Sequence, residues 1–489
     1  GREREGGRGA EGSSGGAGAA EREGARQEES PASPPSSRAR GLVAMGAGGS
    51  KTQRLDKALL HAQLPESEHY FGLENFGNTC YCNSVLQALY YCLPFRARCL
   101  EHAAAAAANG DDDLLSCLCE LFLSISSQKK RCGVHAPKKF ITKLRRVNEL
   151  FNNQMHQDAH EFLNYLLNES AELLEKKQKL EAEQKHAERS GTDVSESDEN
   201  GSGEADDDSG STSSGGKPKG EYKPKTWIHS TFEGVLTSET RCMCCESLTS
   251  RDERFLDLSV EIEQNSSVSA CIKNFSSSES LRDDNKFFCD TCCSLQEAKK
   301  CIRIKRLPNV LALHLKRFKY IEELQRFKKL SSRIAFPFEL KLTNTAESAV
   351  DPDREYQLFA VVVHVGAGAS HGHYVSLVRS HHHWLLFDDD TVELVEEASI
   401  QSCFGSAVES SGSTETGYIL FYQATTWDGE AGNLGSEESS LRNLSRVYGD
   451  APAQLDGERN GRQAPSRMEG SSASSHEDSV VSSMSVVSP

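Results

Sequence analysis

The sequence predicts an α+β protein, because a helical segment precedes a strand-rich segment and the two kinds of element do not alternate. Residues 66–177 carry apolar side chains at helical spacing, whereas residues 223–424 carry short β-branched and aromatic runs between turn-forming residues. The two ends are rich in Gly, Ser and charged residues and hold few large apolar side chains. We therefore expect one folded domain over 66–424, with disordered extensions at 1–65 and 425–489.

The composition narrows the classes of function. The 489 residues include 72 acidic and 55 basic side chains, a formal net charge of -17, and such a field repels phosphate backbones. Nucleic acid is therefore not an expected partner. No apolar run reaches the about 20 residues that span a bilayer, so no transmembrane segment is expected. The sixteen cysteines then fit a reducing compartment, the cytoplasm and/or the nucleus, where thiols serve as ligands, nucleophiles or core residues.

The N-terminal extension contains one sequence pattern of interest. Met45 is the first methionine, and the following GAGGS fits N-myristoylation of Gly46 if translation starts there. A chance match in a Gly-rich segment fits equally well. One myristoyl chain would add only a weak membrane contact.

Three helical stretches fill residues 66–177. They read CYCNSVLQALYYCL, DLLSCLCELFLSISS and HQDAHEFLNYLLNESAELLEKK, and in the last Phe162, Leu163 and Leu166 recur at helical spacing. That helix leads into a polar, acidic and Ser/Gly-rich segment, which we expect to be a disordered insert at 178–222.

The first of these helices places a thiol at its start. Asn, Gly and Thr precede Cys80, and such residues typically introduce a helix, so the helix is expected to begin near Thr79 or Cys80. A thiol in the first turn faces unpaired amides and the positive end of the helix dipole, which lower its pKa. Because a buried cysteine is more often an inert core residue, a nucleophile needs a partner base.

A histidine and a run of aspartates supply candidate partners. His373 opens a predicted strand after a Gly-rich turn, and a second strand ends in Asp388, Asp389 and Asp390. A hairpin of these strands would place a carboxylate beside the imidazole. With Cys80 this gives the constellation of a papain-like hydrolase, although the aspartate run also fits a solvated turn or a hard-metal site. The Asn75 side-chain amide could donate a hydrogen bond to a developing oxyanion, or Asn75 could simply stabilise the turn before the helix.

Two cysteine clusters, RCMCCE and FCDTCC, each contain the spacing C-x-x-C. Four thiolates on two such turns suit a tetrahedral Zn²⁺ ion, and a redox pair or unliganded core thiols are the alternatives. The additional cysteines Cys244 and Cys293 leave the choice of ligands open.

Several motifs together resemble one protein family. GLENFGNTCYCNSVLQAL resembles the cysteine box of the ubiquitin-specific proteases, and GHYVSLV, WLLFDDDTV and GYILFY resemble their histidine box. NQMHQDAHEFLNYLL and LALHLKRFKY are similar to two further boxes, and the match runs in order from about residue 70 to 424. The resemblance implies a papain-like fold with a helical thumb at 66–177, and with palm and zinc-bearing fingers within 223–424.

The resemblance also implies a catalytic role for each matching residue. Cys80 would be the nucleophile, His373 the general base, Asp388 the carboxylate that orients it and Asn75 the oxyanion donor. Asp389 is adjacent, and the sequence does not separate its role from that of Asp388. The implied reaction is thiolate attack on the carbonyl of ubiquitin's C-terminal glycine, release of a lysine amine and hydrolysis of the thioester.

The substrate and metal sites follow from the same resemblance. Asp158 and Glu161 would receive the arginines of the ubiquitin tail, and Gly372 and Tyr374 would line a channel for its Gly-Gly end. The alternatives are that Asp158 and Glu161 lie on a solvated helix face and that Gly372 and Tyr374 belong to a strand turn. The resemblance implies one structural zinc ion and no organic cofactor. The zinc ligands would be Cys242, Cys245, Cys289 and Cys292.

The expected partners are ubiquitin and ubiquitinated proteins. The short catalytic domain and the phrase QDAHEFLNYLLN are most similar to the small subgroup activated by WD40-repeat proteins and to its plant counterparts. The expected function is therefore a deubiquitinating cysteine protease that needs such an activator. The alternatives are a zinc-stapled ubiquitin-binding scaffold with silent catalysis, and a papain-like hydrolase for another substrate.

Overall fold

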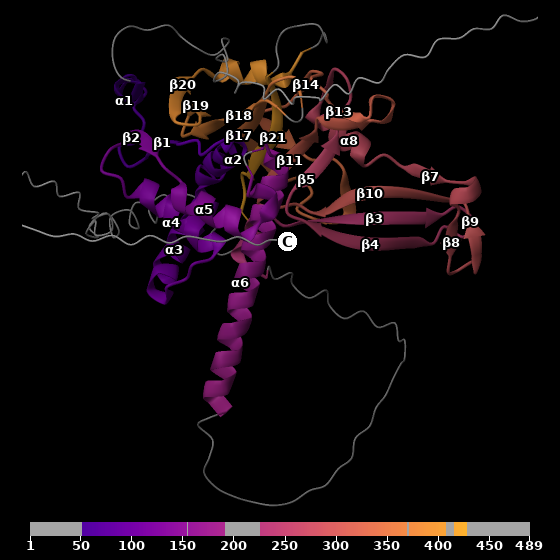
Figure 1. Cartoon of the computed structure of the whole chain (residues 1–489). Helices are drawn as coiled ribbons and strands as arrows, with labels where there is room; N and C mark the ends of the chain where they lie inside the picture. Colours follow the sequence, from indigo (N-terminus) through magenta and orange to yellow (C-terminus); the bar gives the residue numbers. More distant parts are fainter. Residues whose placement is uncertain (1–50, 154, 191–224, 369–370, 407–414, 428–489) are drawn as a thin grey trace, which may run out of the picture.

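The computed structural model describes residues 51–153, 155–190, 225–368, 371–406 and 415–427. A helical lobe packs beside a central sheet, and a second, narrower sheet extends away from both (Figure 1). This arrangement is the predicted α+β fold, with the helical lobe as the thumb, the central sheet as the palm and the narrow sheet as the fingers.

The helices lie mostly in the thumb, and none of those in the described ranges combines the length and apolar character needed to cross a bilayer. Helix α2 is buried at all of its 11 residues and lies on the side of the thumb that meets the palm. Asp113 caps α4 by accepting a hydrogen bond from the Ser116 amide at 2.7 Å. The helices are α1 Lys51–His61, α2 Cys80–Tyr90, α3 Leu93–Asn109, α4 Leu114–Ser126, α5 Lys138–Val147, α6 Ala159–Ser190, α7 Trp227–Phe232 and α8 Val268–Phe275, with short 3-10 helices at Glu149–Phe151, Asp283–Asn285, Glu322–Leu324 and Glu397–Phe404.

Two boundaries predicted from composition need correction. The predicted disordered extension 1–65 includes α1, which is ordered because Leu55 and Leu59, one helical turn apart, are buried in the thumb core. The predicted insert 178–222 is helical up to Ser190, since α6 continues past its buried part as an exposed, charged helix. Gly46, the remaining parts of both segments, and residues 428–489 lie outside the described ranges.

The palm sheet has the strand order β20-β19-β18-β17-β21-β11-β5, with β15 paired to β17. Alternate residues face opposite sides, as the two-residue period of a strand requires. In β21, for example, Ile419 and Phe421 join the core shared with the thumb, whereas Leu420 and Tyr422 join the core on the other face. The strands are β5 Leu258–Glu261, β11 Val310–Lys316, β15 Glu339–Lys341, β17 Glu355–Val365, β18 His373–Ser380, β19 His383–Asp388, β20 Thr391–Val395 and β21 Glu415–Ala424.

The fingers sheet has the order β16-β10-β3-β4, with β7 paired to β10 and the hairpin β8–β9 at its outer end (Figure 1). Its strands are β3 Gly234–Cys242, β4 Leu248–Phe255, β7 Glu279–Leu281, β8 Phe287–Cys289, β9 Ser294–Gln296, β10 Ala298–Arg306 and β16 Thr345–Val350. Three short pairs complete the fold: β1 Tyr70–Leu73 with β2 Cys132–His135, β6 Ser266–Ser267 with β14 Ile334–Ala335, and β12 Phe318–Ile321 with β13 Arg326–Lys329.

A fully buried arginine ties the palm to its flanking loops. The Arg317 guanidinium donates from Nε to the Gly417 carbonyl at 2.6 Å and from Nη1 to the carbonyls of Leu330 and Ser332, both at 3.0 Å. A longer bond of 3.4 Å reaches the Phe404 carbonyl. Burial lowers the pKa of Arg317 to about 10, so the guanidinium stays charged at neutral pH. One side chain therefore satisfies backbone carbonyls from three separate segments.

We expect Arg317→Leu to destabilise the protein by about 3 kcal/mol or more, because several buried carbonyls lose their donor at once. Urea unfolding followed by circular dichroism measures the change. Arg98→Leu is the matched control, since Arg98 is exposed and forms a surface ion pair with Glu101, and it should cost less than about 1 kcal/mol. Equal unfolding midpoints for Arg317→Leu and wild type would contradict this account.

Candidate active site

Cys80 is the first residue of α2, as the sequence predicts, and only 3% of its surface is exposed. The loop before it turns sharply because Gly77 and Asn78 adopt left-handed backbone conformations with φ of 83° and 52°. Asn75 supports this turn, since its Oδ1 accepts a hydrogen bond from the Thr79 amide at 3.2 Å. The thiol therefore sits where the amides of the helix start converge.

His373 and Asp388 meet at the open end of a hairpin. His373 is the first residue of β18 and Asp388 the last of β19, and the two strands pair antiparallel as expected. The His373 Nε2 atom lies 2.6 Å from Asp388 Oδ1. This pairing leaves Nδ1 as the nitrogen available to a sulfur atom.

The structure gives the two aspartates different contacts. Asp389 Oδ2 accepts from the Asn75 amide and Asp389 Oδ1 from the Asn83 amide, both at 2.8 Å, while its distance to His373 Nε2 is 4.0 Å. The φ of 48° at Asp389 turns its side chain away from that of Asp388. Asp388 therefore contacts the imidazole, and Asp389 orients the side chain of Asn75.

A second histidine, which the sequence reasoning missed, also contacts the thiol. His156 Nε2 lies 3.8 Å from Cys80 Sγ, within hydrogen-bond range for sulfur. His156 belongs to the box NQMHQDAHEFL, but no local pattern distinguishes it from the other histidines. Its place two residues before Asp158, already a candidate, is the only signal that pointed toward it.

The electrostatics of the site favour a charged pair. Burial raises the pKa of Cys80, but hydrogen bonds and charge from His156 and His373 outweigh it and bring the pKa to about 7. For His373, burial lowers the pKa, whereas the hydrogen bonds to Asp388 and Cys80 raise it to about 10. Between these values the thiolate and the imidazolium coexist.

Three of the other predicted contact residues differ in exposure, and the first of them, Asp158, is half-buried. Asp158 Oδ1 caps α6 by accepting from the His160 amide at 2.7 Å, and its Oδ2 accepts from the Tyr418 hydroxyl at 2.6 Å. Glu161 is exposed, whereas Tyr374 is buried, with 2% of its surface exposed.

Gly372 occupies a position that only glycine fits. Its φ is +153°, and a Cβ atom there would lie 2.4 Å from His364 Nε2. The backbone before His373 therefore passes close to a buried imidazole, which fixes where β18 begins.

Four cysteines gather at the outer end of the fingers: Cys242, Cys245, Cys289 and Cys292. Their sulfur atoms lie within 4.8 Å of one another, with 3.5 Å between Cys245 and Cys289 and 4.0 Å between Cys242 and Cys292. Sulfur atoms around a tetrahedral zinc ion are about 3.8 Å apart. This group can hold a zinc ion, and it does not include Cys244 or Cys293, which are exposed.

The charges in this cysteine group also favour a cation. The Ser247 hydroxyl lowers the pKa of Cys289 to about 6, whereas the neighbouring Cys245 raises the pKa of Cys292. Crowded sulfurs cannot all ionise alone, and a divalent cation between them removes this penalty.

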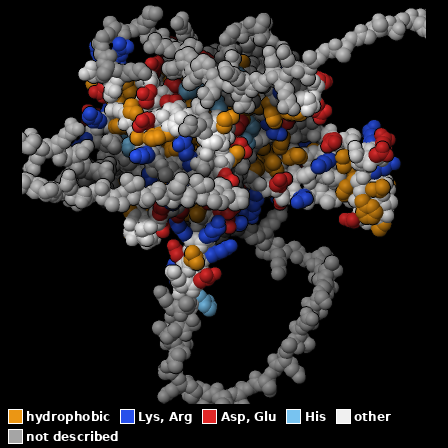
Figure 2. All heavy atoms as spheres, in the orientation of Figure 1, with side chains coloured by type: hydrophobic (Ala, Val, Ile, Leu, Met, Phe, Trp, Pro, Cys, Tyr) orange, Lys and Arg blue, Asp and Glu red, His pale blue; other side chains and the backbone are white. Residues whose placement is uncertain are grey.

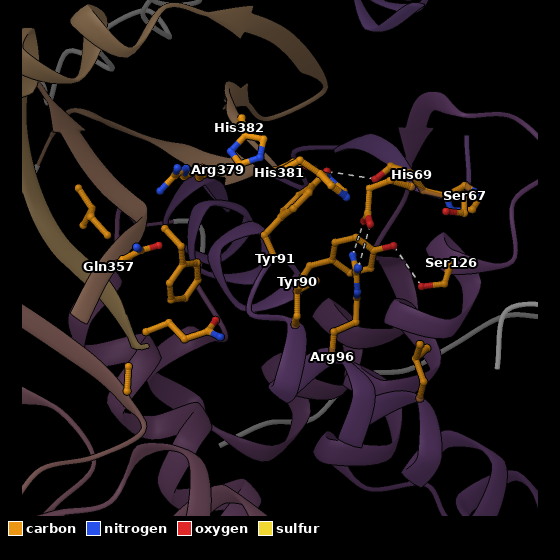
Figure 3. A pocket seen from close by; sticks show the side chains of 18 of the residues that line it. Ser67, His69, Tyr90, Tyr91, Arg96, Ser126, Gln357, Arg379, His381 and His382 are labelled. Atoms are coloured by element: carbon orange, nitrogen blue, oxygen red, sulfur yellow. Dashed lines mark hydrogen bonds and ion pairs between the residues drawn. The ribbon is translucent and has the colours of Figure 1, made fainter. Parts of the chain in front are cut away.

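A pocket of about 540 Å³ lies elsewhere, between thumb and palm (Figure 3). Its lining includes Tyr90 at the end of α2 and Tyr91 directly after it, together with Arg379, His381 and His382. Neither Cys80 nor His373 lines this pocket, so it is separate from the thiol and imidazole pair.

We expect alkylation of Cys80 by iodoacetamide to rise as the pH increases through about 7, because the thiolate forms above its lowered pKa. Peptide mass spectrometry at a series of pH values measures the rate. Cys82 is the internal control, since burial raises its pKa well above the usual value, and it should remain unmodified. A Cys80 midpoint near the ordinary thiol value of about 8.5 would contradict the charged pair.

Comparison with known proteins places the chain in a family. The family description "Ubiquitin carboxyl-terminal hydrolase" matches residues 71–422. The chain is 56% identical over 382 residues to ubiquitin carboxyl-terminal hydrolase 4 of Arabidopsis thaliana, covering 78% of this chain and 99% of that protein. It is 50% identical over 376 residues to ubiquitin carboxyl-terminal hydrolase 12 of Salmo salar, covering 77% and 95%.

Solved structures agree on the fold. A chain of the SAGA Ubp8/Sgf11/Sus1/Sgf73 DUB module bound to ubiquitin aldehyde matches with a TM-score of 0.53 and 23% identity, over 74% of this chain and 71% of that one. A structure of the module bound to monoubiquitin gives the same TM-score and identity, over 76% and 75%. With the family match across residues 71–422, these findings establish that the chain belongs to the ubiquitin carboxyl-terminal hydrolase family and is a ubiquitin-specific protease, a deubiquitinase of the cysteine type.

Proposed function

We propose that Cys80 is the nucleophile of this deubiquitinase, that His373 is its general base, and that Asp388 orients the imidazole. The substrates are isopeptide and thioester bonds at the C-terminal glycine of ubiquitin on protein conjugates. The observation that carries the assignment is the position of Cys80 at the start of α2 beside an imidazole held by Asp388 at 2.6 Å.

The reaction proceeds in two steps. The Cys80 thiolate attacks the glycine carbonyl carbon, and the developing oxyanion accepts hydrogen bonds from the Asn75 amide and the Cys80 backbone N–H. His373 then gives its proton to the departing lysine amine, leaving a thioester. In the second step His373 takes a proton from water, hydroxide adds to the thioester carbonyl and the thiolate leaves.

The tail of ubiquitin is the expected ligand around this centre. Glu161 is exposed and can pair with a tail arginine, and Asp158 adds negative charge at the same helix start. Gly372 and Tyr374, which flank His373, would line the channel for the Gly-Gly end of the tail, and Gly372 lets the backbone pass close to His364. The related DUB modules bound to ubiquitin aldehyde and monoubiquitin support ubiquitin as the partner of this chain.

The scaffold alternative receives less support. A silent enzyme would have no need for a lowered thiol pKa beside a paired imidazole, or for Asp389 to hold Asn75 in place. A reducing location, the cytoplasm and/or the nucleus, would keep both Cys80 and the cysteine group in the thiol form that these roles need.

The four cysteines of the fingers are proposed to hold one structural zinc ion. Four thiolates complete a tetrahedron and leave no position for water or substrate, so the ion would stabilise the finger tip rather than take part in the reaction. No organic cofactor enters the proposed reaction.

A WD40-repeat activator is proposed to bind the finger tip. Exposed apolar side chains gather there, at the outer end of the fingers (Figure 2). An apolar patch with charged neighbours is typical of a protein-binding surface. The patch consists of Met243, Leu248, Phe288 and Leu295, exposed by 51%, 51%, 55% and 62%.

We expect ubiquitin with a C-terminal electrophile to form one covalent adduct per chain at Cys80, because the thiolate attacks that carbon as it would attack the substrate. Intact-mass spectrometry of wild type, Cys80→Ala and Cys82→Ala detects it. The adduct should vanish only in Cys80→Ala. Repeating the reaction with a WD40-repeat partner should accelerate it, and Phe288→Asp should abolish the acceleration while leaving the unassisted rate unchanged.

The outcomes of this experiment separate the proposals. An adduct that persists in Cys80→Ala would contradict the assignment of Cys80 as the nucleophile. The absence of an adduct both with and without the partner would favour the ubiquitin-binding scaffold instead. An adduct that forms at the same rate with the partner would remove the activator from the proposal but leave the chemistry in place.

Zinc removal should destabilise the fingers. We expect Cys289→Ser to lose the bound zinc, measured by elemental analysis, and to lower the melting temperature, because the metal ties β3 to the β8–β9 hairpin. Cys293→Ser is the matched control in the same hairpin, and its zinc content should equal that of wild type. A Cys289→Ser protein that retains a full zinc ion would contradict the ligand assignment.

A further inference from the structure

His156 lies in the loop before α6 and is held against the nucleophile by two rings. Its imidazole stacks on Tyr374, with ring centroids 5.4 Å apart and an interplanar angle of 27°, and it meets His364 edge to face at 6.2 Å. The Nε2 atom is 3.8 Å from Cys80 Sγ. The direction of this ring is therefore fixed by packing, independently of the His373–Asp388 pair.

The other ring nitrogen of His156 determines which nitrogen carries the proton. Nδ1 is buried and has no hydrogen-bond partner among the described residues. A proton on Nδ1 would be a buried hydrogen-bond donor without an acceptor. An unprotonated Nδ1 costs less free energy, and it leaves the N–H on Nε2, directed at the sulfur. His373 differs, since its far nitrogen meets a carboxylate and it can hold a positive charge.

Several titratable groups lie around His156. Cys80 faces it from α2, His364 from β17, and His373 and Tyr374 from β18. Burial lowers the pKa of His364 to about 2, so that ring is neutral, and Lys329 of β13 lies behind it, donating to the His364 carbonyl at 3.0 Å.

We propose that His156 donates a hydrogen bond from Nε2 to the Cys80 sulfur, and that this bond holds the thiolate ionised and aimed before substrate arrives. His156 touches the reacting atom but transfers no proton. This role rests on the proposed function, in which Cys80 is the nucleophile, and it adds a second imidazole with a task distinct from that of the general base.

A hydrogen bond to a thiolate has two opposite effects on reactivity. It increases the fraction of sulfur that is ionised, and it reduces the nucleophilicity of each thiolate, as a lowered thiol pKa generally does. Losing the donor should therefore slow Cys80 at low pH and leave its rate at high pH unchanged or increased. General damage to the site would instead lower the rate at every pH.

The test is the pH profile of Cys80 alkylation by iodoacetamide in the full chain, read by peptide mass spectrometry. His156→Phe keeps a ring against Tyr374 but has no N–H, and we expect its midpoint to rise by about one pH unit, a roughly tenfold loss of thiolate below the midpoint. His156→Leu, a second donor-free variant, should behave in the same way. His156→Gln keeps an N–H and should stay close to wild type.

His102→Phe is the matched control, since His102 lies on α3 and also has a buried ring nitrogen without a hydrogen-bond partner among the described residues. It should leave the midpoint unchanged. Wild-type midpoints in His156→Phe and His156→Leu, or an equal shift in His156→Gln, would overturn the donor role. Labelling of the wild-type chain by the ubiquitin electrophile separately tests Cys80 as nucleophile, so a shifted midpoint without labelling would refute the proposed function alone.

Discussion

The packing of α2 against strand β18 is the contact on which the active site depends. The helix contributes Cys80 and the strand contributes His373, and the two elements belong to different lobes. Apolar residues of both, including Leu86 and Val378, lie in one continuous buried core. The distance between Cys80 and His373 is therefore set by the same burial that joins thumb to palm, and small changes in this packing alter that distance.

Much of the site was predictable because its signals are local. A helix start after Asn, Gly and Thr indicated Cys80, and a Gly-rich turn before a strand indicated His373. The separate roles of Asp388 and Asp389 were not predictable, since they depend on a left-handed backbone at Asp389. His156 was missed for a related reason: its contact with Cys80 spans 76 positions in the chain and leaves no periodic pattern.

The fold shows the same division between local and long-range information. The α+β order and the hairpin of β18 and β19 follow from strand and turn patterns. Composition, in contrast, wrongly predicted disorder for α1, because two buried leucines in a polar helix hardly change the average composition of the segment. The cysteine spacing indicated two pairs, but excluding Cys244 and Cys293 required knowing the geometry of two turns, the one between β3 and β4 and the one between β8 and β9.

The length of the fingers has a mechanical consequence. Strand β3 has 9 residues and ends at Cys242. At about 3.3 Å per residue, its outer end is roughly 30 Å from its base. A protein that binds only at that end contacts the sheet about one strand length from its base. Such a protein would act mechanically on the rest of the domain, by limiting how far the sheet bends.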